Sequence, residues 1–136
     1  MDLYKKKVGF VAGNFDLIHP GYIKLFKFAK NFCDFLIVAI HENPSIERAK
    51  KFTPIHTLHE RKIIISSIKF VDQITQYKFE KDLVKLLKKF PISIRFLDEK
   101  YKFKKITGSE LNIPIKWVPR KHKYSTTNLV KKIKLL

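Results

Sequence analysis

Short apolar segments alternate with amphipathic segments along the chain, and this alternation constrains the fold more than any other feature. Five apolar segments read as β-strands: residues 8–12, 34–40, 71–74, 92–97 and 115–118. Between and after them, periodicity or capping residues predict helices over residues 20–32, 57–70, 79–90 and 125–134. Strands that alternate with helices are typical of a parallel sheet with helices packed on its faces.

We therefore predict a single domain of residues 1–136 with an α/β fold, a Rossmann-like doubly wound parallel five-stranded sheet. A chain of this length can build a core without disulfide or metal staples. The single cysteine, Cys33, forbids an intramolecular disulfide and is expected to be a small core residue. Sheets of this class bind ligands beyond the carboxyl ends of their strands, where the strand order reverses. The turn after the first strand is therefore the first place to look for chemistry.

The chain is strongly basic, with a formal net charge of +17. Of its 29 basic residues, 25 are lysine and four are arginine, whereas base-reading surfaces favour arginine. The lysines are spread along the chain, which favours a lysine-rich proteome as the explanation, with attraction of anionic ligands as the alternative. We expect no specific nucleic-acid partner. No apolar run approaches the ~20 residues of a membrane span and no signal-peptide layout is present, so we expect a cytoplasmic protein without a membrane partner.

The turn after the first strand combines two glycines, a histidine and the start of a helix. Gly13 lets a ligand approach the backbone, and the N–H groups at a helix start attract phosphate. His19 lies at about the N-cap, with Pro20 at the favoured first helical position. Gly21 leaves space where a phosphate would sit. The spacing alone leaves two interpretations open: a phosphate site, or a strand–turn–helix whose histidine only caps the helix.

Two separated motifs resemble those of one enzyme family, the cytidylyltransferase group of nucleotidyltransferases. Its G-x-F-D-x-x-H-x-G-H signature is matched by Gly13-Asn14-Phe15-Asp16-x-x-His19-x-Gly21. Its R-T-x-G-I-S-T-T segment is matched by Arg120 and by Tyr124-Ser125-Thr126-Thr127. The similarity covers essentially the whole chain. Within the group, the chain looks most like small single-domain glycerol-3-phosphate cytidylyltransferases.

The resemblance implies transfer of CMP from CTP to a small phosphorylated acceptor, such as glycerol-3-phosphate, with release of pyrophosphate. The attacking phosphate oxygen is already anionic, so catalysis requires positioning and charge stabilisation rather than a general base. His19 would donate to an α-phosphate oxygen. Backbone N–H groups near Asn14 and Phe15 would hold the nucleotide phosphates, while Asp16 would brace the turn.

The resemblance also assigns roles outside the first turn. Arg120 and residues 125–127 would bind the β- and γ-phosphates. Lys50 or Lys51 lies near the position of substrate- and phosphate-binding lysines in relatives, although both fit ordinary solvated lysines equally well. Mg²⁺ would accompany CTP and be held mainly by the triphosphate, so no protein ligand cluster is expected. Relatives are commonly dimers, and a homodimer is expected here.

Three segments depart from the family pattern. Tyr22 replaces the second histidine of the signature, and a phenol donates one hydrogen bond but brings no positive charge. Asp98-Glu99-Lys100 replaces a G-x-D segment beside the base and the acceptor. The last motif lacks its threonine, glycine and isoleucine, and His122 there is expected to be a loop residue on a basic surface. His19, Tyr22 and Lys50 remain the expected catalytic residues, the first two facing one phosphate group.

These departures leave more than one function open. The first is an active cytidylyltransferase whose acceptor or rate has drifted. The second is a nucleotide- or phosphate-binding homologue that keeps the fold and has lost most catalysis. A third is an adenylyltransferase for a pantetheine-like or flavin substrate, which shares the first motif but not the Ser-Thr-Thr ending. RNA binding by the lysine-rich surface ranks last.

Overall fold

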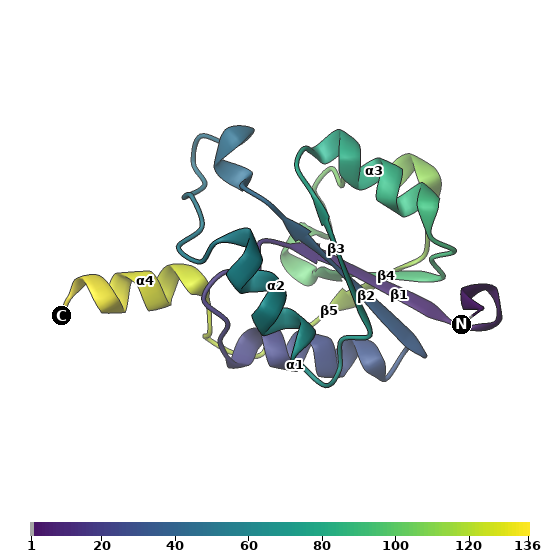
Figure 1. Ribbon diagram of the computed structural model, residues 1–136, viewed down its shortest axis with the longest axis horizontal. Helices are drawn as coiled ribbons and strands as arrows, with labels where there is room; N and C mark the ends of the chain where they lie inside the picture. Colours follow the sequence, from purple (N-terminus) through teal and green to yellow (C-terminus); the bar gives the residue numbers. More distant parts are fainter. Residues whose placement is uncertain (1) are drawn as a thin grey trace.

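The computed structural model describes residues 2–136 and contains one sheet of 5 parallel strands (Figure 1). The strands are β1 (Val8–Gly13), β2 (Phe35–His41), β3 (Gln73–Tyr77), β4 (Ile94–Asp98) and β5 (Ile115–Val118), in the order β3-β2-β1-β4-β5. The helices are α1 (Pro20–Lys30), α2 (Leu58–Ser66), α3 (Glu80–Lys89) and α4 (Thr126–Lys134). The predicted α/β fold with a parallel, doubly wound sheet is confirmed.

Helices cover both faces of the sheet (Figure 1). α1 and α2 pack on one core that contains Phe26 and Ile65, and α3 packs on the other face through Leu83. Residues 36–40 of β2 are each 0% exposed because the strand is covered on both faces. Cys33 is buried in the first core, as predicted, although α1 ends before it.

The start of α2 is fixed by a capping box, as its sequence predicts. The Thr57 hydroxyl accepts from the amide of Glu60 (3.1 Å), and the Glu60 carboxylate accepts from the amide of Thr57 (2.9 Å). The predicted end near residue 70 is wrong, because α2 ends at Ser66. The hydroxyls of Ser66 and Ser67 donate to the carbonyl of Ile63, and such side-chain bonds compete with continuation of a helix.

The third strand begins later than predicted. The expected strand over residues 71–74 lies at Gln73–Tyr77 instead. Asp72 lies just before this strand. Its carboxylate accepts from the amide of Leu36 (2.8 Å) and from the ammonium of Lys30 (2.7 Å). Asp72 therefore ties α1 to the start of β2, and the strand forms after it.

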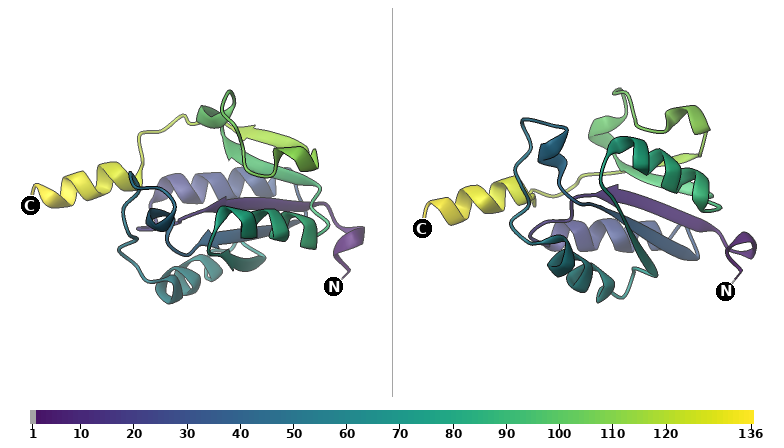
Figure 2. Two further views of the ribbon diagram at one scale, coloured as in Figure 1. Left: turned by 90° about the horizontal axis from the view of Figure 1, so that it is seen from above. Right: turned by 45° about the horizontal axis from the view of Figure 1, so that its top comes forward.

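The sheet topology creates a crevice at the carboxyl ends of the central strands. The strand order reverses at β1, which pairs with β2 on one side and β4 on the other. The carboxyl ends of β1 and β4, at Gly13 and Asp98, therefore border the position where such sheets bind ligands. α4 starts near this edge and extends away from the sheet, carrying the carboxyl terminus with it (Figures 1 and 2). Among residues 2–136, none of the helices has the length and apolar character needed to cross a bilayer.

Candidate functional site

A cavity of about 730 Å³ opens at the carboxyl ends of β1 and β4. It brings together the first turn, the segment after β4 and the residues leading into α4, which are far apart in the sequence. Lys51 lines it, whereas Lys50 is exposed and lies outside the lining. The expected site residues that line it are Gly13, Asn14, Phe15, Asp16, His19, Gly21, Tyr22, Lys51, Arg120, Ser125, Thr126 and Thr127.

The backbone of the first turn is held in an uncommon conformation. Phe15 and Leu17 have left-handed φ angles of 51° and 50°, which cost free energy for residues other than glycine. The Phe15 ring is 2% exposed and packs against Tyr22 and Phe26, with ring centroids 5.5 Å apart in both pairs. Core packing of this ring therefore holds the turn in its shape, and the amides of residues 15–18 donate to no acceptor among residues 2–136.

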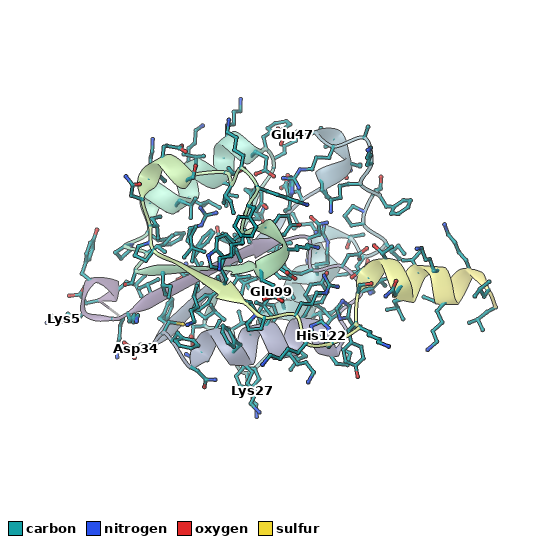
Figure 3. All side chains as sticks on the ribbon, turned by 180° about the vertical axis from the view of Figure 1, so that it is seen from behind. Lys5, Lys27, Asp34, Glu47, Glu99 and His122 are labelled. Carbon is teal, nitrogen blue, oxygen red and sulfur yellow. The ribbon has the colours of Figure 1, made fainter. Side chains whose placement is uncertain are left out.

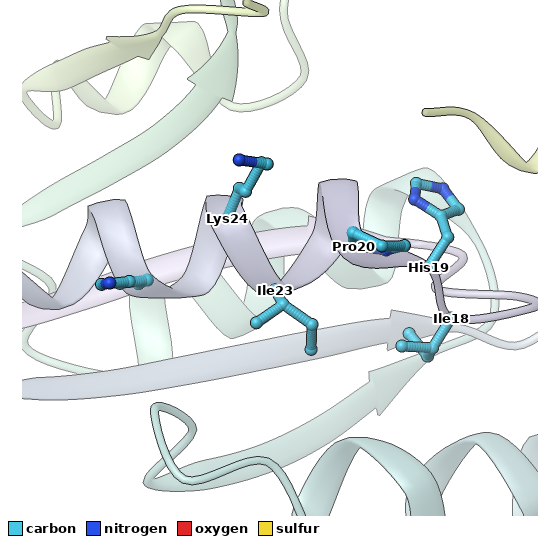
Figure 4. Close-up of a pocket in the computed structure, with 6 residues that line it drawn as sticks. Ile18, His19, Pro20, Ile23 and Lys24 are labelled. Carbon is cyan, nitrogen blue, oxygen red and sulfur yellow. The ribbon is translucent and has the colours of Figure 1, made fainter. Parts of the chain in front are cut away.

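His19 caps α1 and lines the cavity. Its Nδ1 accepts from the amide of Gly21 (3.1 Å), so the proton of the neutral ring is on Nε2. Burial lowers the pKa of His19, and the nearby His122 and Arg120 lower it further. Figure 4 shows His19 and Lys24 on one side of α1, with Ile18 and Ile23 on the other. The neutral ring is thus a hydrogen-bond donor at the amino end of α1.

The Asp16 carboxylate holds the segment that leads to α2. Its buried carboxylate accepts from the amides of Ile55 (2.8 Å) and His56 (2.9 Å), which lie in the segment leading to α2. Both oxygens are occupied by backbone donors, so Asp16 fixes the position of this segment relative to β1. The role of Asp16 in bracing the first turn itself stays a prediction.

Arg61 holds together the segments that follow β1 and β2 and the segment that precedes α2. The sequence alone assigned it no part in the site. It is 2% exposed, and its guanidinium donates to the carbonyls of Asn14 (2.9 Å), His41 (2.6 Å), Glu42 (2.5 Å) and His56 (3.2 Å). These carbonyls follow β1 and β2 and precede α2. A single buried arginine therefore joins three elements at the base of the cavity. The sequence signal for Arg61 was its place in the Glu60-Arg61 pair, which opens the predicted helix and resembles the same stretch in the family.

Tyr22 lines the cavity, and its hydroxyl is hydrogen-bonded to the second motif. The Thr126 hydroxyl donates to the carbonyl of Asp16 (2.8 Å), because a carbonyl can only accept. The Tyr22 hydroxyl, 3.1 Å from the same Thr126 oxygen, must then be the donor in that pair. Its proton is committed to Thr126 rather than to a phosphate. The Tyr22 ring also stacks on His19, with centroids 4.2 Å apart.

Arg120 is coupled to the segment that departs from the family pattern. Its guanidinium lies 3.5 Å from the Asp98 carboxylate and donates to the carbonyl of Tyr124 (2.9 Å). The Arg120 amide donates to the Glu99 carboxylate (3.1 Å). Asp98 in turn accepts from the amide of Lys100 (2.9 Å) and starts a short 3₁₀ helix. The acidic residues after β4 thus hold the loop that carries the second motif.

His122 is a half-buried loop residue between two exposed lysines, as expected, but it also belongs to the site, which the sequence did not predict. It lines the cavity, and Figure 3 shows it between the amino end of α1 and the start of α4. A Cβ atom placed on Gly21 would lie 2.7 Å from Cε1 of His122 and 2.8 Å from Cε1 of His19. His122 and Gly21 are far apart along the chain, so the sequence alone did not indicate this contact.

The electrostatics of the cavity favour anionic ligands. Arg48, Lys51, Lys100 and Lys105 line it together with Arg120. In the described part of the chain, no group of three or more His, Cys, Asp or Glu side chains is placed to hold a metal ion. Hydrogen-bond donors and cations around a turn with free amides are suited to binding phosphate groups.

The chain is similar to proteins of one family. The cytidylyltransferase-like family model matches residues 10–132. The bifunctional protein HldE of Campylobacter concisus is 30% identical over 131 residues, a match covering 96% of this chain and 28% of that protein. The chain thus spans less than a third of the length of the curated relatives it matches.

Solved structures with the same fold agree with this match. The lipopolysaccharide core biosynthesis protein of Thermoplasma volcanium superposes with a TM-score of 0.68 and 26% identity, covering 88% of this chain and 99% of that one. Pantothenate synthetase of Thermus thermophilus, at 13% identity, shares the fold with a TM-score of 0.64, covering 90% of this chain and 61% of its own. With the family model matched over most of the chain, the protein belongs to the cytidylyltransferase-like family.

Proposed function

We propose that this domain catalyses nucleotidyl transfer from a nucleoside triphosphate to a phosphorylated acceptor. The observation that carries the proposal is the meeting of two phosphate motifs at one end of α1. Thr126 of the second motif bonds to the Asp16 carbonyl of the first, across 110 residues of sequence. A single triphosphate can therefore contact both motifs at once.

In the proposed reaction, an acceptor phosphate oxygen attacks the α-phosphorus of the triphosphate. The new oxygen–phosphorus bond forms as the bond to the bridging oxygen breaks, and pyrophosphate leaves with that electron pair. His19 donates from Nε2 to an α-phosphate oxygen, where negative charge grows. Arg120 and the hydroxyls of Ser125 and Thr127 bind the β- and γ-phosphates, while the Thr126 hydroxyl holds the two motifs together.

Mg²⁺ fits this proposal as a companion of the nucleotide. The carboxylates nearest the phosphate motifs are already engaged, Asp16 by two backbone amides and Asp98 by an amide and Arg120. The ion would therefore be held mainly by the triphosphate oxygens, and would offset their charge. The residues of this chain orient the phosphates around it.

The acceptor is proposed to be a small phosphorylated polyol or sugar. The family signature supports CTP as donor and a glycerol-3-phosphate-like acceptor, and the cations Arg48 and Lys51 line the same cavity as the first turn. The second candidate is ATP with a sugar phosphate. The sugar phosphate is favoured by the similarity to the Thermoplasma volcanium protein, whose name places it in lipopolysaccharide core biosynthesis.

A matrix of pyrophosphate-release assays tests the proposal. CTP and ATP are each supplied with Mg²⁺ and with either glycerol-3-phosphate or a set of sugar 1-phosphates. The proposal predicts that pyrophosphate is released only when an acceptor is present, and with one of the two donors. Faster release with CTP than with ATP would support the base that the family signature indicates. Triphosphate binding without release for any pair would instead support the binding-protein alternative.

A further inference from the structure

The family signature carries a second histidine where this chain has Tyr22. The phenol cannot replace it as a phosphate donor, because its proton is given to Thr126 and the Thr126 proton to the Asp16 carbonyl. These two hydrogen bonds tie the motifs together. The phosphate contact that the second histidine of the signature would make therefore has no donor from α1.

His122 occupies the space next to this position from the other motif. The rings of His19 and His122 meet over Gly21, where an added Cβ would be 2.8 Å and 2.7 Å from their respective Cε1 atoms. Gly21 therefore makes room for two imidazoles rather than one. The two rings come from opposite ends of the chain and are close enough that His122 lowers the pKa of His19.

Backbone hydrogen bonds give both rings the same orientation of donor and acceptor. Nδ1 of His19 accepts from the amide of Gly21, and Nδ1 of His122 accepts from the amide of Tyr124, each at 3.1 Å. Because a backbone amide can only donate, Nδ1 carries no proton in either ring, and Nε2 does. Two Nε2–H donors thus flank the amino end of α1, beside Arg120.

We propose that His122 supplies the phosphate contact that Tyr22 has lost, donating from Nε2 to the phosphate group that His19 also contacts. The site keeps two imidazole donors, but the second now comes from the loop before α4. The identity of the anion as a nucleoside triphosphate rests on the proposed function, whereas the pairing of the two histidines does not.

Calorimetric titration with inorganic tripolyphosphate tests the contact without any turnover. His122→Ala should lower the affinity about 10-fold, equivalent to about 1.4 kcal/mol. His122→Gln should retain most of the affinity, because its side-chain amide can still donate. His59→Ala is the matched control, since His59 is exposed on α2 outside the cavity lining, and it should leave the affinity unchanged. Equal affinities for wild type and His122→Ala, or no binding by the wild type, would overturn the proposal.

Two further readouts separate this proposal from the proposed function. Long-range ¹⁵N–¹H spectra should show both His19 and His122 protonated on Nε2 when neutral, with the His122 signals shifting as tripolyphosphate is added. Loss of affinity in His122→Ala with no nucleotidyl transfer by the wild type would overturn the proposed function and leave the histidine pair standing. Nucleotidyl transfer by the wild type, with an unchanged rate and unchanged tripolyphosphate affinity in His122→Ala, would overturn the proposed His122 contact and leave the proposed function standing.

Discussion

At the scale of single residues, the hydroxyl of Tyr22 joins the two motifs. Tyr22→Phe keeps the ring that stacks on His19 and removes only the donor to Thr126. We expect the free energy of unfolding to fall by about 1 kcal/mol, the usual net value of one hydrogen bond. Urea denaturation measures it, with Tyr4→Phe as the control because Tyr4 is 84% exposed. Equal losses in the two variants would mean that the link to Thr126 contributes nothing.

The buried His41 and the half-buried His19 make the stability depend on pH. Burial lowers the pKa of His19 and of His41 below the ordinary histidine value of about 6.5. At a pH below the unfolded-state pKa of these histidines, the folded chain therefore binds fewer protons than the unfolded chain. The free energy of unfolding is full above that pKa and falls as the pH drops below it. His41→Gln should reduce the fall in melting temperature between pH 7.5 and 5.5, while His59→Gln should not. A fall that is unchanged in His41→Gln would contradict this assignment.

At the scale of elements, Arg61 joins the ends of β1 and β2 to the start of α2. Arg61→Lys keeps the charge but cannot donate to four carbonyls that surround the guanidinium. We expect a loss of about 2–3 kcal/mol in the free energy of unfolding, on the scale of hydrogen bonds to charged groups. Arg48→Lys, which alters the half-exposed ion pair with Glu80, should cost less than about 1 kcal/mol. Similar losses at both positions would contradict the bracing role.

Element boundaries were predictable where the chain signals them locally. β5 matches its predicted range of 115–118, and α4 begins after Ser125 as predicted. The error at β3 arises because Asp72 binds the start of β2, a contact that its own neighbours do not reveal. Residues of both motifs line the cavity, but the motifs did not reveal the contacts of Tyr22, Arg61 and His122. These contacts join segments far apart in the sequence.

At the scale of the whole molecule, α4 extends away from the sheet with apolar side chains exposed. Ile133 is 51% exposed on this helix, and Phe52 nearby is 72% exposed, with the Lys134 ammonium 5.6 Å from its ring centroid. The predicted homodimer would cover such residues. Sedimentation should then give a dimer for the wild type and a monomer for Ile133→Lys. A wild type that remains monomeric at high micromolar concentration would refute the dimer.

Steady-state kinetics of His19→Ala and Arg120→Ala, on the donor and acceptor pair that supports turnover, test the shared triphosphate site most directly. His19→Ala should lower kcat at least ~100-fold, the scale of one lost oxyanion donor, without unfolding the protein. Arg120→Ala should instead weaken nucleotide binding, seen as a raised KM and dissociation constant. Unchanged kcat in His19→Ala, with unchanged affinity in Arg120→Ala, would contradict a site in which both motifs bind one triphosphate.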